Sequence, residues 1–241
     1  NISYQFAKFI HDLVVKESKL LTTTQIEMIL VSFFELLNLV LEQDKYLDYY
    51  RKLLAKRLMK NSNHQINMEK LILNKSKLIL GFQGTYQMEK MIDDTILHLT
   101  SPLFITHNSS NYHYRIITAH YWPIIPNLSF TPHSSVNTYL TQFENDYLQK
   151  YTHRKITWIY PYGIAEIKLN LSPNTTIPIS GPLLDISILT YLVESYTEKD
   201  GMVLSFSNLV HKLTLSPENT NLLIQSLHKI NKHKLIYFIP N

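Results

Sequence analysis

The residues that could take the most chemical roles in this 241-residue chain are its eleven histidines, which can bind metal ions or act as general bases near neutral pH. Three histidine pairs lie close together in sequence, namely His107/His113, His113/His120 and His228/His233. Zinc sites usually combine histidine with cysteine or place two histidines in an HExxH motif. The chain has no cysteine and no HExxH, so we expect no metal site and no bound cofactor.

A serine nucleophile with a histidine base is the second chemistry to consider, because His133 directly precedes Ser134 and Ser135. Acyl transfer by such a pair also needs a buried carboxylate that orients the histidine, and adjacency in sequence supplies none. The motifs GxGxxG, GxxxxGK[ST] and GxSxG are absent from a chain that has only five glycines. We therefore expect no catalytic residues and interpret the protein as a non-enzyme.

The composition indicates an intracellular globular protein, in the cytoplasm, the nucleus or both. Hydrophobic residues make up 45% of the chain and charged residues 17%. The chain contains no cysteine, so it lacks the disulfide-forming residues that would indicate a secreted protein. The most apolar stretch, residues 26–41, contains Glu27 and Glu35, which are costly in lipid, so we expect a core helix and no membrane span. A first residue of Asn1 suggests an excised fragment whose true ends the sequence does not give.

Hydrophobic periodicity predicts helices through the first hundred residues. Phe6, Phe9, Ile10 and Leu13 recur at the spacing of one helix face. Further helical patterns cover residues 25–42, 44–59, 68–80 and 88–99. Because the intervening loops are short, these helices should form an antiparallel bundle.

The pattern changes after Pro102, where β-branched and aromatic residues become frequent. It predicts strands at residues 115–122, 155–160 and 165–171, with a helix at 135–151, and a turn at 161–163 should join the last two strands into a hairpin. The tail has helical patterns at 184–196, 206–213 and 217–231, then a strand at 234–239, an order typical of a winged helix. The predicted fold class is α+β and mostly helical: an antiparallel helical bundle (1–100), a small α/β unit (101–183) and a winged-helix-like subdomain (184–241).

Residues 49–59 (YYRKLLAKRLM) closely resemble the YYxxxLAKRLL signature of the cullin homology region. Further segments resemble the same family in the same order: 88–94 (MEKMIDD) the LExMFxD run, 116–123 (IITAHYWP) the VLTTGYWP strand, and 147–158 (YLQKYTHRKITW) the FYLxKHSGRKLTW segment. Residues 163–166 (GIAE) are similar to its GxAxL continuation. The sequence departs from the family at residues 151–153, where the turn glycine is missing. The resemblance covers nearly the whole chain.

The resemblance implies a non-catalytic scaffold of a cullin–RING ubiquitin ligase. In this family the α/β unit holds a RING-finger protein by completing a shared sheet, and thereby brings a ubiquitin-conjugating enzyme near substrate. Zinc is expected only in the RING partner. The partner-binding residues that the resemblance implies are Arg115, Ile117, Tyr121, Trp122, Lys155, Ile156, Thr157, Trp158, Ala165, Ile167 and Leu169.

Two assignments keep an alternative. Tyr121, Trp122 and Trp158 would wall the partner groove, or the two tryptophans fill a junction between subdomains. A basic patch, defined as Arg51, Lys52, Lys56 and Arg57, would attract the acidic conjugating enzyme. Alternatively, it is a solvated helix face, with Arg57 paired to a neighbouring carboxylate.

Other functions also remain open at the level of sequence. The chain could be the cullin-like subunit of the anaphase-promoting complex, which shares the homology region. It could also be a winged-helix nucleic-acid-binding protein that reads bases with Asn219, Asn221 and Gln225, although we expect no nucleic acid and no membrane as partners. The resemblance to cullins implies that the region that binds substrate adaptors, and the lysine that accepts a ubiquitin-like modifier, lie outside these residues.

Overall fold

The computed structural model describes residues 1–18, 20–39, 42–60, 64–100, 112–123, 128–172, 175–198 and 204–236. The chain forms two compact units, Asn1–Ile124 and Ile125–Asn241, each with its own hydrophobic core. The predicted mostly helical α+β class is confirmed. No helix in the described ranges combines the length and apolar character needed to cross a membrane.

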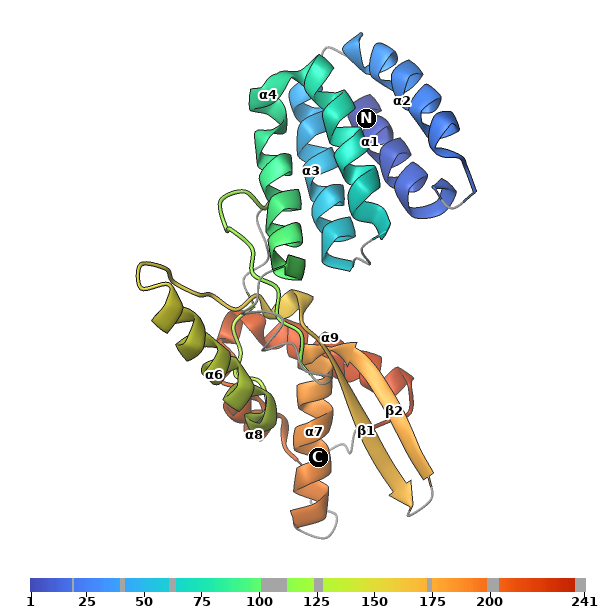
Figure 1. Ribbon diagram of the computed structural model, residues 1–241. Helices are drawn as coiled ribbons and strands as arrows, with labels where there is room; N and C mark the ends of the chain where they lie inside the picture. Colours follow the sequence, from blue (N-terminus) through green and yellow to red (C-terminus); the bar gives the residue numbers. More distant parts are fainter. Residues whose placement is uncertain are drawn as a thin grey trace. The chain divides into compact units, whose positions relative to one another are not determined.

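The first unit is a helical bundle (Figure 1). Its elements are α1 (Ile2–Asp12), the π-helical turn η1 (Leu13–Glu17), α2 (Thr23–Asn38), α3 (Gln43–Lys60) and α4 (His64–Thr100). Thr22 caps α2 through a reciprocal capping box with Gln25, which fixes where this helix begins. Helix α1 packs on α3, and α4 packs on both α2 and α3.

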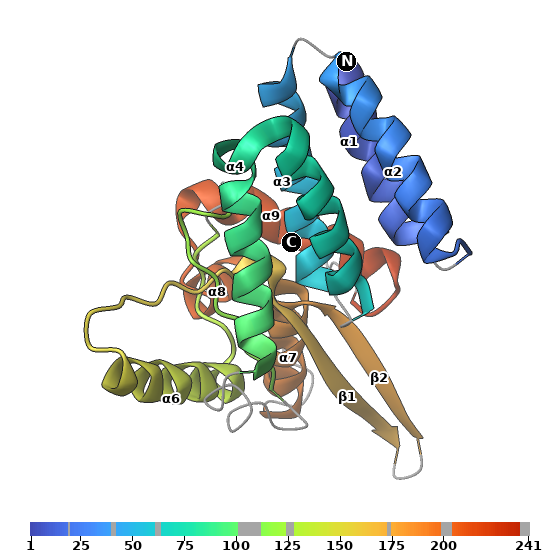
Figure 2. The same ribbon diagram turned by 45° about the horizontal axis from the view of Figure 1, so that its top comes forward.

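Helix α4 bends sharply at Gly81, whose φ of 71° and ψ of 170° are not helical. Only glycine adopts this backbone conformation without strain, so the glycine fixes the corner. The two arms of α4 then run side by side, as both ribbon views show (Figures 1 and 2). The ion pair between Lys77 and Glu89 joins the arms at 2.7 Å. The bend turns one long helix into two antiparallel members of the bundle.

The core of the first unit is rich in aromatic rings. The Phe33 ring lies 5.1 Å from that of Phe34 and 6.2 Å from that of Tyr46, and Tyr46 stacks on Tyr50 at 5.8 Å. Burying such rings contributes strongly to stability. This cluster fixes α3, the helix that carries the basic patch.

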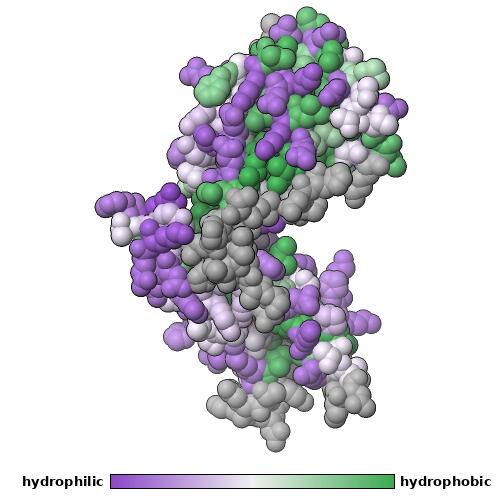
Figure 3. Space-filling model, viewed as in Figure 1, coloured by the Kyte–Doolittle hydropathy of each residue, from purple (hydrophilic) through white to green (hydrophobic). Residues whose placement is uncertain are grey.

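The second unit places helices around a two-stranded antiparallel sheet. Its elements are α6 (Ser134–Lys150), the 3₁₀ turn η2 (Tyr160–Tyr162), β1 (Ile164–Ser172), β2 (Thr175–Pro182), α7 (Leu183–Glu198), α8 (Phe206–Lys212), the 3₁₀ turn η3 (Pro217–Asn219) and α9 (Thr220–Lys232). The hairpin of β1 and β2 packs against α7 (Figure 2). Helix α6 carries a strongly hydrophilic outer surface (Figure 3).

Two of the predicted strands are wrong. Residues 115–122 have no strand, and residues 155–159 have none before η2 begins. Strand β1 confirms the prediction at 165–171, but its partner is β2 at Thr175–Pro182. The prediction missed β2 because Pro178 and Pro182 argue against a strand in a single sequence. At the chain end, residues 234–236 are not a strand, and 237–239 lie outside the described residues.

Candidate functional site

The segment 112–123 is held against α4 by one carboxylate. Asp94 accepts hydrogen bonds from the Thr118 backbone N–H at 2.8 Å, the Thr118 hydroxyl at 3.0 Å and the Trp122 indole N–H at 2.9 Å. The backbone closes into a turn where the Tyr121 N–H donates to the Thr118 carbonyl at 3.0 Å. Trp122 is only 6% exposed and belongs to the core of the first unit. Its ring therefore fills that core and does not wall an open groove.

Arg115 also binds within the first unit. Its guanidinium donates to the carbonyls of Leu58 and Met59 at 2.9 and 2.6 Å. These carbonyls lie in the last turn of α3, where no helical N–H reaches them, and burial lowers the pKa of Arg115. Ile117 packs on the same core. This half of the predicted partner surface thus holds its own segment onto the bundle.

Tyr121 makes an edge contact with Tyr86 of α4, with ring centroids 5.8 Å apart. The two hydroxyls are 3.5 Å apart, and this hydrogen bond raises the pKa of Tyr121. The side chain is half-buried. Tyr121 therefore adds a second tie between the 118–122 turn and α4.

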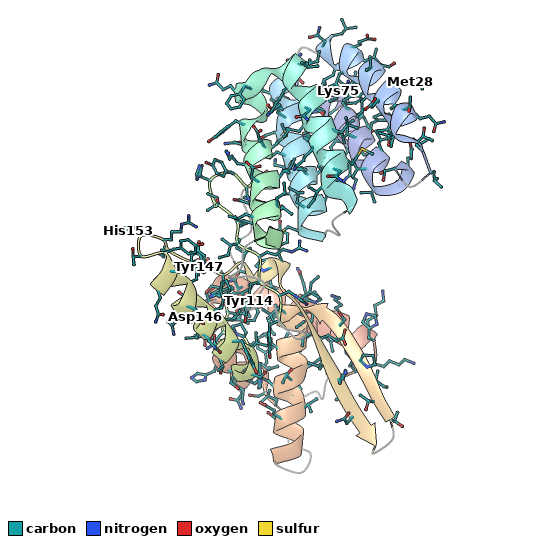
Figure 4. The ribbon with its side chains drawn as sticks, in the orientation of Figure 1. Met28, Lys75, Tyr114, Asp146, Tyr147 and His153 are labelled. Carbon is teal, nitrogen blue, oxygen red and sulfur yellow. The ribbon has the colours of Figure 1, made fainter. Side chains whose placement is uncertain are left out.

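The segment 154–159 in the second unit is bound to α6 by side chains. Arg154 donates to the Tyr147 hydroxyl at 2.8 Å, which raises the pKa of Arg154. The Trp158 indole donates to Glu144 at 3.3 Å, and its ring lies 6.1 Å from that of Phe143. Tyr147 projects from α6, and the turn after this helix carries His153 (Figure 4).

The backbone between these two anchors is available for pairing. Lys155 and Thr157 are exposed and Ile156 is half-buried. No backbone hydrogen bond joins these three residues to any other residue that the structure describes. Exposed backbone groups of this kind are the groups that an added strand would bind.

The β1–β2 hairpin has one face toward the core and one toward solvent. Ala165, Ile167 and Leu169 pair with Gly181, Ile179 and Ile177. Ala165 and Ile167 pack on the core of the second unit, while the alternate residues Glu166 and Lys168 are exposed. The predicted residues of β1 therefore support the hairpin with their side chains, which leaves the backbone as the group that could bind a partner.

The basic patch is smaller than the sequence suggested. The Arg57 side chain is 1% exposed and forms a two-point ion pair with Glu69, which is fully buried. Its Nε and Nη2 lie 2.5 and 3.0 Å from the two carboxylate oxygens. Burial is the largest single effect and acts to lower the pKa of Arg57, but the charge and hydrogen bond of Glu69, together with Tyr50 and Tyr46, raise the pKa on balance. Arg57 is a core residue and takes no part in a surface patch.

Arg51 is also partly used inside the unit, because its guanidinium donates to Gln87 and, at 3.2 Å, to Asp48. Lys52 and Lys56 are exposed on α3. Of the four predicted basic residues, Lys52 and Lys56 are therefore the two whose side chains are exposed to solvent.

Glu69 is the carboxylate that pairs with Arg57, and it was not identified from the sequence. It lies at helical spacing from Ile66, Leu73 and Ser76, all of which are buried. A carboxylate on a buried helix face requires a cationic partner, and this signal was present in the sequence. Asp94 stands at the aspartate of the LExMFxD-like run, but its hydrogen-bond partners could not be predicted because they lie on a segment whose path depends on the tertiary fold.

The serine–histidine pair forms contacts between α6 and α7. His133 Nε2 lies 2.7 Å from Glu194 Oε1, and Nδ1 lies 2.8 Å from the Ser135 hydroxyl. Nδ1 also accepts the Ser135 backbone N–H at 3.3 Å, so His133 is the N-cap of α6. Glu194 is 43% exposed and not the buried carboxylate that a triad requires. We interpret these contacts as a cap and a tie between two helices.

Histidine pairs do not gather into a metal site in the part of the chain that the structure describes. No group of three or more histidine and acidic side chains is suitably placed there. His107 lies outside the described residues.

Comparison with known proteins identifies two matching family models. Residues 2–98 match the cullin alpha solenoid domain, and residues 116–240 match the cullin alpha+beta domain. The chain is 27% identical to cullin-1 of Oryza sativa subsp. japonica over 234 residues, which is 93% of this chain and 30% of that protein. It is 25% identical to cullin-1 of Schizosaccharomyces pombe over 210 residues (84% and 26%), and 26% identical to cullin-2 of Arabidopsis thaliana over 235 residues (91% and 30%). The chain thus spans less than a third of the length of these relatives.

Proposed function

This chain belongs to the cullin family, and we propose that it is the part of a ubiquitin-ligase scaffold that holds a RING-finger protein. The observation that carries the proposal is backbone of the second unit without a backbone hydrogen bond among the described residues, at the exposed or half-buried residues Lys155–Thr157 and on the outer edges of the β1–β2 hairpin. A partner strand that pairs with such backbone gains affinity from main-chain hydrogen bonds and selectivity from alternate side chains.

The scaffold acts by proximity and has no catalytic side chains of its own. The RING-finger protein carries the zinc and recruits the ubiquitin-conjugating enzyme, and the chain holds both near a substrate. Holding two reacting groups close together accelerates their reaction without further chemistry. A substrate adaptor binds a part of the protein outside these residues, and the complex functions inside the cell.

The first unit gives this scaffold its rigidity. The buried pair of Arg57 and Glu69 and the bonds of Asp94 to the 118–122 turn tie α3, α4 and the following segment together. Lys52 and Lys56 supply a small positive surface that raises the rate of encounter with an acidic conjugating enzyme. Such an effect is screened by salt.

The test is capture of a purified cullin-type RING-finger protein by the chain and by an Ile156→Asp variant. The substitution places a charge among the backbone groups proposed to pair, so we expect capture to fall at least about tenfold. Ile224→Asp is the matched control, because Ile224 is an isoleucine 40% exposed on α9 of the same unit. We expect the control to bind like the wild type.

Circular dichroism of both variants shows whether the helices remain folded. Undiminished capture by Ile156→Asp would remove the 155–157 segment from the interface. A wild-type chain that captures no RING-finger protein would refute the proposed function itself. Binding to duplex DNA that falls steeply with salt would instead favour a nucleic-acid-binding winged helix.

A further inference from the structure

A row of aromatic rings runs along the arm of α4 that follows Gly81 and onto the 118–122 turn. The Phe82 ring lies 5.6 Å from that of Tyr86, and the Tyr86 ring lies 5.8 Å from that of Tyr121. The His120 imidazole continues the row at 3.8 Å from the Tyr121 ring. The aromatic row is defined as Phe82, Tyr86, Tyr121 and His120. All four residues belong to the first unit, whereas RING capture is proposed on the second.

The aromatic row is open to solvent over much of its length. Phe82 is 63% exposed, His120 is also exposed, and the two tyrosines are half-buried. A ring that stays in water does not contribute the free energy that its burial would give to folding. Several such rings in contact with one another form a surface that an apolar ligand can cover.

The charged side chains beside the aromatic row neutralise one another. The Lys77 and Lys90 ammonium groups lie 5.7 and 5.6 Å from the centroids of the two rings on α4. Lys77 pairs with Glu89 at 2.7 Å, and Lys90 pairs with Asp93 at 3.1 Å. These two ion pairs carry no net charge, so they do not attract a strongly charged ligand such as a nucleic acid. The ligand that fits is uncharged where it meets the rings.

The aromatic row is ordered before any ligand binds. Asp94 fixes the 118–122 turn through its hydrogen bonds to the Thr118 N–H and the Trp122 indole. Tyr86 stands on α4 and contacts Tyr121 edge to face, with the ring planes at 82°. A ligand that binds to rings already in place loses less conformational entropy than one that must order them.

The two tyrosine hydroxyls leave one hydrogen-bond donor available to a ligand. They lie 3.5 Å apart, and either one can donate to the other. Each hydroxyl has one hydrogen, so when one donates, the hydrogen of the other is not used by this pair. The bond is also long for an O–H···O contact, so a hydroxyl can turn toward a ligand carbonyl at small cost.

We propose that the aromatic row binds a proline-rich segment of a partner protein in the polyproline II conformation. Such segments dock on aromatic-lined surfaces. Their backbone carbonyls form no internal hydrogen bonds, so a carbonyl can accept the free tyrosine O–H. One polyproline II turn covers roughly 9 Å, comparable with the two ring steps from Phe82 to Tyr121. The segment is uncharged, as the neutral surroundings of the row require.

Fluorescence polarisation with a labelled decaproline peptide and the full 241-residue chain tests the proposal. We expect saturable binding with a Kd of about 1 mM or lower, and binding at least about tenfold weaker for a glycine–serine peptide of the same length. Phe82→Ala should weaken decaproline binding at least about fivefold. Met28→Ala is the matched control, because Met28 is 60% exposed and projects from α2 (Figure 4); it should bind within about twofold of the wild type.

Tyrosine-to-phenylalanine substitutions test the hydrogen-bond donor separately from the rings. Tyr86→Phe or Tyr121→Phe alone leaves one O–H in the pair, so each variant should bind decaproline within about twofold of the wild type. The double variant Tyr86→Phe/Tyr121→Phe keeps both rings and removes both hydrogens. It should bind about fivefold more weakly, the loss expected for one hydrogen bond. Circular dichroism confirms that each variant is folded.

Four results would overturn the proposal. The first two are no binding of decaproline by the folded wild type and equal binding of the glycine–serine peptide. The third is an unchanged affinity in Phe82→Ala or in the double tyrosine variant. The fourth is a different occupant. Binding of oligothymidylate in place of decaproline would assign the row to base stacking, and a concentration-dependent dimer lost in Phe82→Ala would assign it to a second copy of the chain.

Discussion

Removal of Arg57 should destabilise the first unit more than any surface substitution, because it leaves Glu69 as an uncompensated charge in the core. In Arg57→Met the stem of the side chain is retained while both hydrogen bonds to the Glu69 carboxylate are lost. Breaking a buried ion pair by removing one partner costs about 3–5 kcal/mol. For a unit of this size, that corresponds to a fall in melting temperature of at least about 12 °C.

Urea unfolding followed by circular dichroism at pH 7 measures this loss. The double variant Arg57→Met/Glu69→Gln removes both charges and keeps an acceptor for the Tyr50 hydroxyl, which lies 3.3 Å from Glu69. It should recover at least about half of the lost free energy of unfolding. Lys16→Met is the surface control, since Lys16 pairs with Asp12 in solvent; its cost should stay below about 1 kcal/mol.

The double variant distinguishes the effect of the uncompensated Glu69 charge from the effect of lost packing around the arginine stem. If it is as unstable as Arg57→Met, then lost packing of the arginine stem explains the effect and the buried charge does not. If Arg57→Met itself costs less than about 1 kcal/mol, the ion pair is not the structural element proposed here.

Three further predictions concern the first unit. Burial, followed by the positive charge of Arg57, lowers the pKa of His11 below 6.5. Since the unfolded chain then binds the proton more readily, the free energy of unfolding should decrease as pH falls below about 6.5. In urea unfolding between pH 7.5 and 5, His11→Gln should flatten this pH dependence. An unchanged slope would contradict the assignment to His11. The buried Tyr46 hydroxyl has no hydrogen-bond partner in the described residues, and burial raises its pKa. Tyr46→Phe should therefore raise the free energy of unfolding by about 1 kcal/mol. A lower free energy of unfolding in this variant would disprove the prediction. Asp94→Ala should shift Trp122 fluorescence to longer wavelength and cost about 2 kcal/mol, whereas an unchanged emission maximum would show that the turn holds without it.

The helices were predictable from sequence because their signals are local. Apolar spacing at Phe6, Ile10 and Leu13 and the capping box at Thr22 depend only on residues within a few positions. Gly81 gave a weaker signal, yet it lies where the patterns at 68–80 and 88–99 are separated. The prediction of two helices there agrees with the two arms of α4.

The strands were less predictable because pairing partners lie elsewhere in the chain. Residues 115–122 have the composition of a strand, but Asp94 and the core around Trp122 bind this segment as a turn. Strand β2 was missed because proline lacks a backbone N–H and therefore argues against a strand. Proline is tolerated only where its nitrogen faces away from the neighbouring strand. The side of the ladder follows from the register, and the register requires three-dimensional coordinates.

Pro178 and Pro182 also govern what the chain can do when no partner is bound. A hairpin open on both sides can be extended repeatedly, as in fibrils. A hairpin with one obstructed side accepts a single neighbour, so two copies that met through β1 would satisfy each other and growth would stop at a symmetric pair. The two prolines thus limit this sheet to one added strand and protect the exposed hairpin from open-ended association.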